Sequence, residues 1–227
     1  LIELALAGGG DPFLRAAVMS SAIPHFQPLL EALLVDDAAD RELQSGLIAM
    51  APDEIAIPLL SDASNPSNAQ LRNAARWLLR HPEKQERFRE LLKSAAEIFA
   101  DQASPVERRA AALPLVITRD RRLVEGVFLN PELTRVAIIA SCERGLGAEL
   151  VAEWRRLSPE MRSLVIDQCL DSLPNGQALT DALGKSIHPR EFTAAQRQRV
   201  LEFKDTKIQA RAKRVFGERV SDRASLV

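Results

Sequence analysis

The chain repeats one helix-starting pattern, in which a residue that favours the N-cap position is followed by proline. The pattern is clearest at four places, Asp11-Pro12, Ser104-Pro105, Asn130-Pro131 and Ser158-Pro159. An N-cap oxygen satisfies a backbone N–H that the first turn leaves free, and proline at the first helical position lacks an N–H and already holds helical φ. The pattern therefore predicts a chain of regularly restarted helices.

The residues after each start are also similar. An arginine in the first turn or so, such as Arg15 or Arg109, precedes small residues and then a bulky apolar run. The residues that follow Arg72 have the same order of small and then bulky side chains, although no proline directly precedes this segment. Small side chains let a neighbouring helix approach closely, and the bulky ones fill a shared core. We expect these segments to be the first helix of each repeat.

A second apolar helix is expected after each first helix, because apolar residues recur there at helical spacing. These second helices are predicted at residues 26–34, 54–60, 85–100, 121–128, 148–157 and 177–183. Helix stops are predicted at Pro24, Pro52, residues 145–147 and residues 174–176, which are rich in proline and glycine. No segment has a convincing strand pattern.

The sequence thus predicts an all-α protein, an α-α superhelix (solenoid) of six to seven HEAT-like helix pairs with an ARM-like fold. Residues 1–7 fit the second helix of a further pair. We expect the repeat array to cover residues 1–187. Residues 188–227 are more polar and basic, and we expect them to form a C-terminal helical cap or linker of the same domain.

Composition argues against two classes of partner. The chain has 30 basic and 31 acidic residues, a formal net charge of −1, whereas nucleic-acid binders usually carry a basic excess. Eight Phe, two Trp and no Tyr leave few aromatic faces for stacking bases or sugars. No run of 18 apolar residues is present, so membrane insertion is not expected. Of the partners considered, we therefore expect the chain to bind a protein.

Residues that could carry catalysis or bind a metal do not form a recognised motif. The three histidines, His25, His81 and His188, each lie beside proline, and none belongs to an HExxH or ExxH arrangement. Gly8-Gly9-Gly10 lacks the spacing of a phosphate-binding loop, and no serine lies in a GxSxG or SxxK motif. We therefore expect no catalytic residue, no bound metal and no cofactor.

The two cysteines, Cys142 and Cys169, lie in apolar helical stretches outside any CxxC motif. Two buried thiols are the favoured interpretation. Their separation of 27 residues is about one repeat, so the fold could also bring them together. A disulfide would require an oxidising compartment.

Arginines and one tryptophan recur near the second helices and suggest a binding surface. The candidate residues are Arg119, Arg121, Arg122, Trp154 and Arg155. If the second helices line the concave side of the solenoid, these residues form a groove for an acidic protein segment or an anionic group. The alternative is a solvated ridge of charged side chains, which is the commoner origin of such runs.

Two phrases of the sequence resemble a known family. They are Asp-Pro-Phe-Leu-Arg-Ala-Ala-Val-Met-Ser-Ser from Asp11 and Ile-Gln-Ala-Arg-Ala-Lys-Arg-Val-Phe-Gly from Ile208, followed by Asp222-Arg223. From Asp11 onward the chain resembles the HEAT-like region of large planctomycete and verrucomicrobial membrane-bound dehydrogenases. In those proteins a β-propeller precedes the helical repeats and a c-type haem domain follows them. Neither propeller repeats nor a CxxCH haem motif occurs in these residues, so the redox activities do not carry over.

The resemblance implies a non-catalytic scaffold that connects redox domains, extracytoplasmic or periplasmic in location. This function is an analogy with the family. One alternative is a HEAT-like enzyme of the DNA-glycosylase or bilin-lyase type, against which the neutral charge and missing tyrosines count. Another is a membrane-surface helix in residues 197–223, where basic residues are frequent but the apolar stripe lacks tryptophan.

Overall fold

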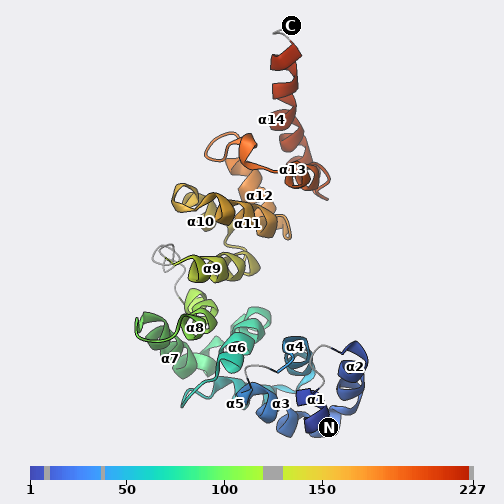
Figure 1. The fold of residues 1–227 in the computed structure, drawn as a ribbon, viewed down its shortest axis with the longest axis vertical. Helices are drawn as coiled ribbons and strands as arrows, with labels where there is room; N and C mark the ends of the chain where they lie inside the picture. The colour runs from blue at the N-terminus through green and yellow to red at the C-terminus, as the bar shows by residue number, and fades with distance from the viewer. Residues whose placement is uncertain (8–10, 37–38, 120–129, 225–227) are drawn as a thin grey trace. The chain divides into compact units, whose positions relative to one another are not determined.

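A computed structural model describes residues 1–7, 11–36, 39–119 and 130–224, with side chains described as far as Gly217. These residues form fourteen α-helices and several short 3₁₀ helices (Figure 1). Within the described ranges there is no β-strand, only an isolated bridge between Leu183 and Ile187. The predicted all-α class is confirmed, and the helices pack against neighbours in sequence order, as in a helical-repeat solenoid.

The chain divides into two compact units, Leu1–Arg121 and Arg122–Val227. The residues of the predicted cap, 188–227, belong to the second unit. The helices of the first unit are α1 (Ile2–Ala7), α2 (Pro12–Ser21), α3 (Phe26–Val35), α4 (Arg41–Met50), α5 (Asp53–Ser61), α6 (Asn68–Arg80), α7 (Arg89–Ala100) and α8 (Val106–Arg119). Those of the second are α9 (Pro131–Glu143), α10 (Gly147–Ala152), α11 (Pro159–Cys169), α12 (Leu173–Ala182), α13 (Ala194–Leu201) and α14 (Thr206–Ala224).

Helices in the first unit pack both with the next helix and with the next but one. The adjacent contacts join α1 to α2, α3 to α4, α5 to α6 and α7 to α8. Alternate helices form two layers, one containing α1, α3 and α5 and the other containing α2, α4, α6 and α8. A hydrophobic core runs between the layers from Ala5 to Val116 and includes Leu29, Leu47 and Leu71, which are fully buried.

The second unit has the same alternation. Helix α9 packs on α11, and α10 packs on α12, which in turn packs on α14. The adjacent contacts join α9 to α10, α11 to α12 and α13 to α14. Its core includes Ile138, Leu150, Val165 and Leu179, all fully buried.

The cap-and-proline pattern marks helix starts as predicted. Asp11 accepts hydrogen bonds from the N–H groups of the first turn of α2, and Asn130 does the same for α9. Ser158 accepts from the Met161 N–H at the start of α11. The expected helix at 121–128 lies outside the described residues.

The sequence analysis was wrong at some boundaries. It missed α4, whose N-cap is Asp40 without a following proline. It took residues 174–176 for a helix stop, whereas Pro174 lies in the first turn of α12. The helices expected at 85–100 and 148–157 are each broken into an α-helix and a 3₁₀ helix, Pro82–Phe88 before α7 and Trp154–Arg156 after α10.

A recurring polar contact closes the helix hairpins of the first unit, and we call each instance a hairpin brace. The Gln44 side chain of α4 donates to the Leu33 carbonyl of α3 at 2.8 Å. The Gln70 side chain of α6 donates to the Leu59 and Asp62 carbonyls at the end of α5, at 3.0 and 2.6 Å. The last carbonyls of a helix have no partner within it. Each brace supplies a donor from the first turn or two of the following helix.

Two arginines of the repeated phrase act as braces in the same way. Arg109 Nε of α8 donates to the Phe99 carbonyl of α7 at 3.0 Å. In the second unit, Arg162 Nε of α11 donates to the Trp154 carbonyl at 3.0 Å. The arginine that recurs near the start of each first helix therefore has a structural use at these two positions.

Candidate functional site

Of the five residues predicted to form a groove, Arg119 lies in the first unit, and Trp154 and Arg155 lie in the second. Arg119 is the last residue of α8 in the first unit, and its side chain is exposed. Arg155 is exposed in the second unit, on the 3₁₀ helix after α10. Arg121 and Arg122 lie outside the described residues. That these residues form one groove stays a prediction.

Trp154 is a core residue and not the exposed anchor that the sequence suggested, because only 2 % of its surface is accessible. Its indole Nε1 donates to Glu191 Oε2 at 2.8 Å. The Arg162 guanidinium lies 5.8 Å from the ring centroid and donates to the same carboxylate oxygen at 3.2 Å. Trp154 was misjudged because its helical stretch ends in two arginines, and the sequence does not show that Glu191 reaches its indole.

Glu191 also organises the turn that precedes α13. Its second oxygen accepts from the His188 N–H at 3.2 Å, and His188 Nδ1 accepts from the Arg190 N–H at 3.1 Å. His188 is thus the N-cap residue of this turn. This turn is thereby attached to Trp154 and α11.

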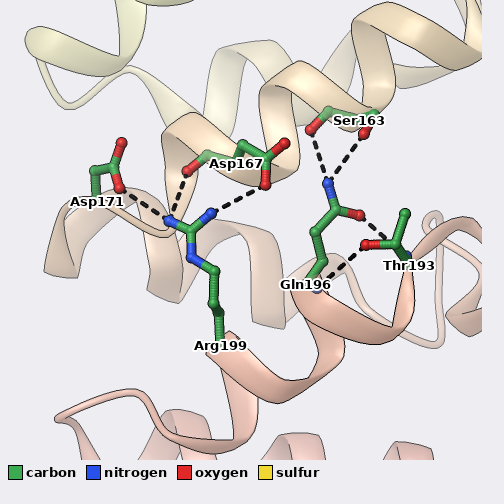
Figure 2. A network of polar contacts seen from close by, with 6 residues as sticks. All are labelled: Ser163, Asp167, Asp171, Thr193, Gln196 and Arg199. Carbon is green, nitrogen blue, oxygen red and sulfur yellow. Dashed lines mark hydrogen bonds and ion pairs between the residues drawn. The ribbon is translucent and has the colours of Figure 1, made fainter.

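A second polar network attaches α13 to α11 (Figure 2). Arg199 forms ion pairs with Asp167 at 3.0 Å and with Asp171 at 2.9 Å. One turn earlier, the buried Gln196 side chain donates to the Ser163 carbonyl at 3.2 Å and to its hydroxyl at 3.0 Å. The Gln196 side chain also accepts from the Thr193 N–H as half of a capping box. Every member of this network is engaged in holding helices together.

A hollow of about 630 Å³ lies beside this network, between the α11–α12 corner and the α13–α14 corner. Leu173, which is 51 % exposed, and Phe203 supply apolar surface. The charged residues of its lining are of both signs and are partly engaged already, since Arg199 is paired with Asp171 and Asp205 accepts from the first N–H groups of α14. The lining has no concentration of one charge, and its Arg199–Asp171 ion pair serves to join helices.

The structure does bring the two cysteines together. Cys142 of α9 and Cys169 of α11 are both buried free thiols, with 3.9 Å between their Sγ atoms. The hydrogen bond with Cys142, together with burial, raises the pKa of the Cys169 thiol. The thiolate form that reacts with oxidants and metals is therefore disfavoured.

Sequence reasoning missed a group of cations on the first unit. Arg41 of α4 and Arg76 and Arg80 of α6 are exposed and line one groove. The signal in the sequence was the four-residue spacing of Arg76 and Arg80, which places two side chains on one face of a helix. That spacing alone did not reveal that α4 lies beside this face.

Within the described ranges no group of three or more His, Cys, Asp or Glu side chains is placed to hold a metal ion. None of the helices in these ranges is both long and apolar enough to cross a bilayer.

Comparisons of the chain with protein-family models, with curated proteins and with solved structures found no match.

Proposed function

We propose that this chain is a non-catalytic helical-repeat scaffold that binds a protein partner. The observation that carries the proposal is the series of hairpin braces formed by Gln44, Gln70 and Arg109 in the first unit. Their polar side chains join one helix to the next, and Arg162 does the same in the second unit. Such a stack holds long exposed helix faces in fixed register, which suits a docking surface.

Polar contacts between alternate helices further support a scaffold. Arg15 of α2 pairs with Asp40 at the start of α4, with 3.0 Å between Nε and Oδ2. The buried Asn73 side chain of α6 donates to the Gln44 side chain of α4 at 3.0 Å. In the second unit, Asn175 of α12 donates to the Cys142 carbonyl at 2.7 Å and accepts from the Gly147 N–H at 2.9 Å. These contacts favour a rigid support for partner binding.

A finer proposal follows from the sequence resemblance alone. It is that the chain connects redox domains of a larger extracytoplasmic protein. The reading frame on either side of these residues tests it. We expect an all-β segment before the repeats and a CxxCH motif after them, and a frame without either would contradict the connector role.

Chemical cross-linking followed by mass spectrometry tests the scaffold proposal in the native host. We expect cross-links from exposed lysines such as Lys93 and Lys207 to another domain or another polypeptide. Native mass spectrometry of the same material should show no stoichiometric small ligand. The proposal fails if a bound small molecule is found in place of polypeptide cross-links.

A further inference from the structure

Helices α4 and α6 pack side by side, and between them the surface is hollowed into a groove of about 330 Å³. We call it the α4–α6 groove. Its lining residues are Arg41, Glu42, Ser45, Gly46, Ala49, Arg76 and Arg80. Three of the seven are arginines, and small residues of α4 form much of the rest.

The charges in this groove are unbalanced. Its one carboxylate, that of Glu42, is already paired with Arg15 of α2. In the part of the chain that the structure describes, no ion pair is formed by Arg41, Arg76 or Arg80. Exposed arginines elsewhere are commonly paired, as Arg135 is with Glu160 and Arg199 is with two aspartates. The groove therefore presents an excess of positive charge on a chain whose net charge is −1.

The spacing of the cations matches an extended peptide. Arg76 and Arg80 are one helical turn apart, and four residues of α-helix rise about 6 Å. Alternate side chains of an extended segment point the same way and are spaced roughly 6–7 Å apart. Carboxylates at every second position can thus meet both guanidinium groups, whose planar forks bind carboxylates bidentately.

Small residues of α4 lie on the floor of the groove. A Cβ atom at Gly46 would lie 2.9 Å from Met19 Cε of α2, the end of a flexible side chain. Ala49, one turn from Ser45, adds another small side chain. The long arginine side chains can close over a ligand main chain lying on this floor.

We propose that the α4–α6 groove binds an acidic protein segment in extended conformation, through carboxylate pairs with Arg41, Arg76 and Arg80. This inference rests on the proposed scaffold function and names the partner chemistry for it. Three cations fall short of the roughly 6–10 phosphate contacts of a typical DNA-binding surface. No aromatic residue lines the groove to stack bases, and no large apolar side chain lines it to enter a membrane.

Fluorescence anisotropy with the full chain and a labelled (Glu-Ser)₄ peptide at low salt tests the proposal. We expect saturable binding, weakened roughly five- to tenfold in the double variant Arg76→Gln/Arg80→Gln, because two charge-assisted pairs are lost. Arg155→Gln, an exposed arginine of the second unit, is the matched control and should leave affinity unchanged. A peptide of the same composition with its four glutamates in one block should bind more weakly.

Several results would overturn the proposal that the α4–α6 groove binds an acidic segment. These are no binding by the wild-type chain, an equal loss in Arg155→Gln, or tighter Arg76- and Arg80-dependent binding of single-stranded DNA or phosphatidylglycerol vesicles. Far-UV circular dichroism and the urea midpoint of the double variant should match the wild type, since both arginines are exposed and unpaired. If the peptide does not bind but native cross-links to a polypeptide are still found, the proposal for the α4–α6 groove is refuted. The scaffold proposal is not affected by that outcome.

Discussion

Gly145, in the connection after α9, and Gly147, the first residue of α10, are needed for different physical reasons. Gly145 has a φ of 72°, and its N–H bonds to the Cys142 carbonyl while the Leu146 N–H bonds to the Ser141 carbonyl. These are the two hydrogen bonds of a Schellman motif, which ends α9. Gly147 is needed for space, because a Cβ there would lie 2.8 Å from Asn175 Oδ1 and 2.9 Å from its Cα.

Substitution by alanine should separate the two roles. Gly145→Ala has open space for its methyl group and should cost only the left-handed backbone strain, about 1–2 kcal/mol. Gly147→Ala should cost more, roughly 2–4 kcal/mol, because it displaces the α12 backbone and the buried Asn175 hydrogen bonds. Urea unfolding measures both, and a Gly147→Ala variant as stable as Gly145→Ala would contradict the close approach.

A second single-residue effect concerns Asp40, which caps α4. Burial by itself raises the pKa of Asp40, but hydrogen bonds from the Leu43 and Glu42 N–H groups and from Arg15 outweigh it and hold the pKa below 3.8. A carboxyl group with a lowered folded-state pKa stabilises the protein above the unfolded-state pKa. That stabilisation is lost as the pH falls through the folded-state pKa.

Asp40→Asn should therefore remove a pH-dependent part of the stability. Asparagine is an equally good N-cap residue, so the cap is retained while the charge is lost. We expect wild type to be more stable than the variant by about 0.5–1 kcal/mol at pH 7, and the difference should shrink to nearly nothing once the pH has fallen through the folded-state pKa of Asp40. Urea midpoints at several pH values measure the difference, and a difference that does not vary with pH would exclude a role for the carboxylate charge.

At the scale of helices, much of the fold could be predicted from the sequence and much of the surface could not. The helix starts at Asp11, Asn130 and Ser158 could be predicted because they depend on neighbouring residues. The N-cap residue and the proline lie next to the N–H groups that they affect. The start of α12 was missed because Asn175 and Gly176 are poor helix formers. Their presence is explained by tertiary contacts, Asn175 with α9 and α10 and Gly176 with Phe203. Such long-range contacts leave no local pattern.

The candidate site illustrates the same limit. The runs of arginine were visible in the sequence, but neither the burial of Trp154 nor the hollow between α4 and α6 was. The arginine that recurs near the helix starts was recognised only as part of the repeated order of residues. At Arg109 and Arg162 it bonds to a backbone carbonyl of the preceding helix, a partner that carries no side-chain signature.

Removing one hairpin brace should destabilise the first unit. Gln70→Ala deprives the Leu59 and Asp62 carbonyls of their donor and should cost about 1–3 kcal/mol. Gln27→Ala is the matched control, because its side chain is exposed and bonds only to Glu31 one turn away. It should cost under about 0.5 kcal/mol. Equal urea midpoints for the two variants would mean that the brace adds no stability.

The cysteine pair allows a test of the contact between α9 and α11. In the folded protein both thiols should react slowly with a water-soluble disulfide reagent, because they are buried and the pKa of Cys169 is raised. Prolonged incubation with oxidised glutathione should convert the pair to an intrachain disulfide, with two thiol hydrogens transferred to form two glutathione thiols. Mass spectrometry should show a loss of two hydrogens, absent in Cys142→Ser, and glutathione adducts alone would contradict the short sulfur distance.

On the scale of the whole molecule, the division into two units separates two cores. The core of the first unit runs from Ala5 to Val116 and so lies entirely before the boundary at Arg121. Its braces, at Gln44, Gln70 and Arg109, also have both partners on the same side of the boundary.

Residues 1–121 alone should therefore fold. We expect a helical far-UV spectrum and a cooperative urea transition, because each helix from α1 to α8 keeps its packing partners within the unit. Gln70→Ala should destabilise this fragment as much as it does the full chain. A fragment without a cooperative transition would show that the first unit depends on residues beyond Arg121.

The hairpin braces all run in one direction along the chain. In each of them the donor belongs to the later helix and the acceptor carbonyl to the earlier one. During synthesis on the ribosome, each helix therefore emerges with its last carbonyls still hydrated, and the next helix completes it after a short delay. At each of these hairpins the carbonyls of the earlier helix therefore gain their side-chain donor only after the later helix has been synthesised.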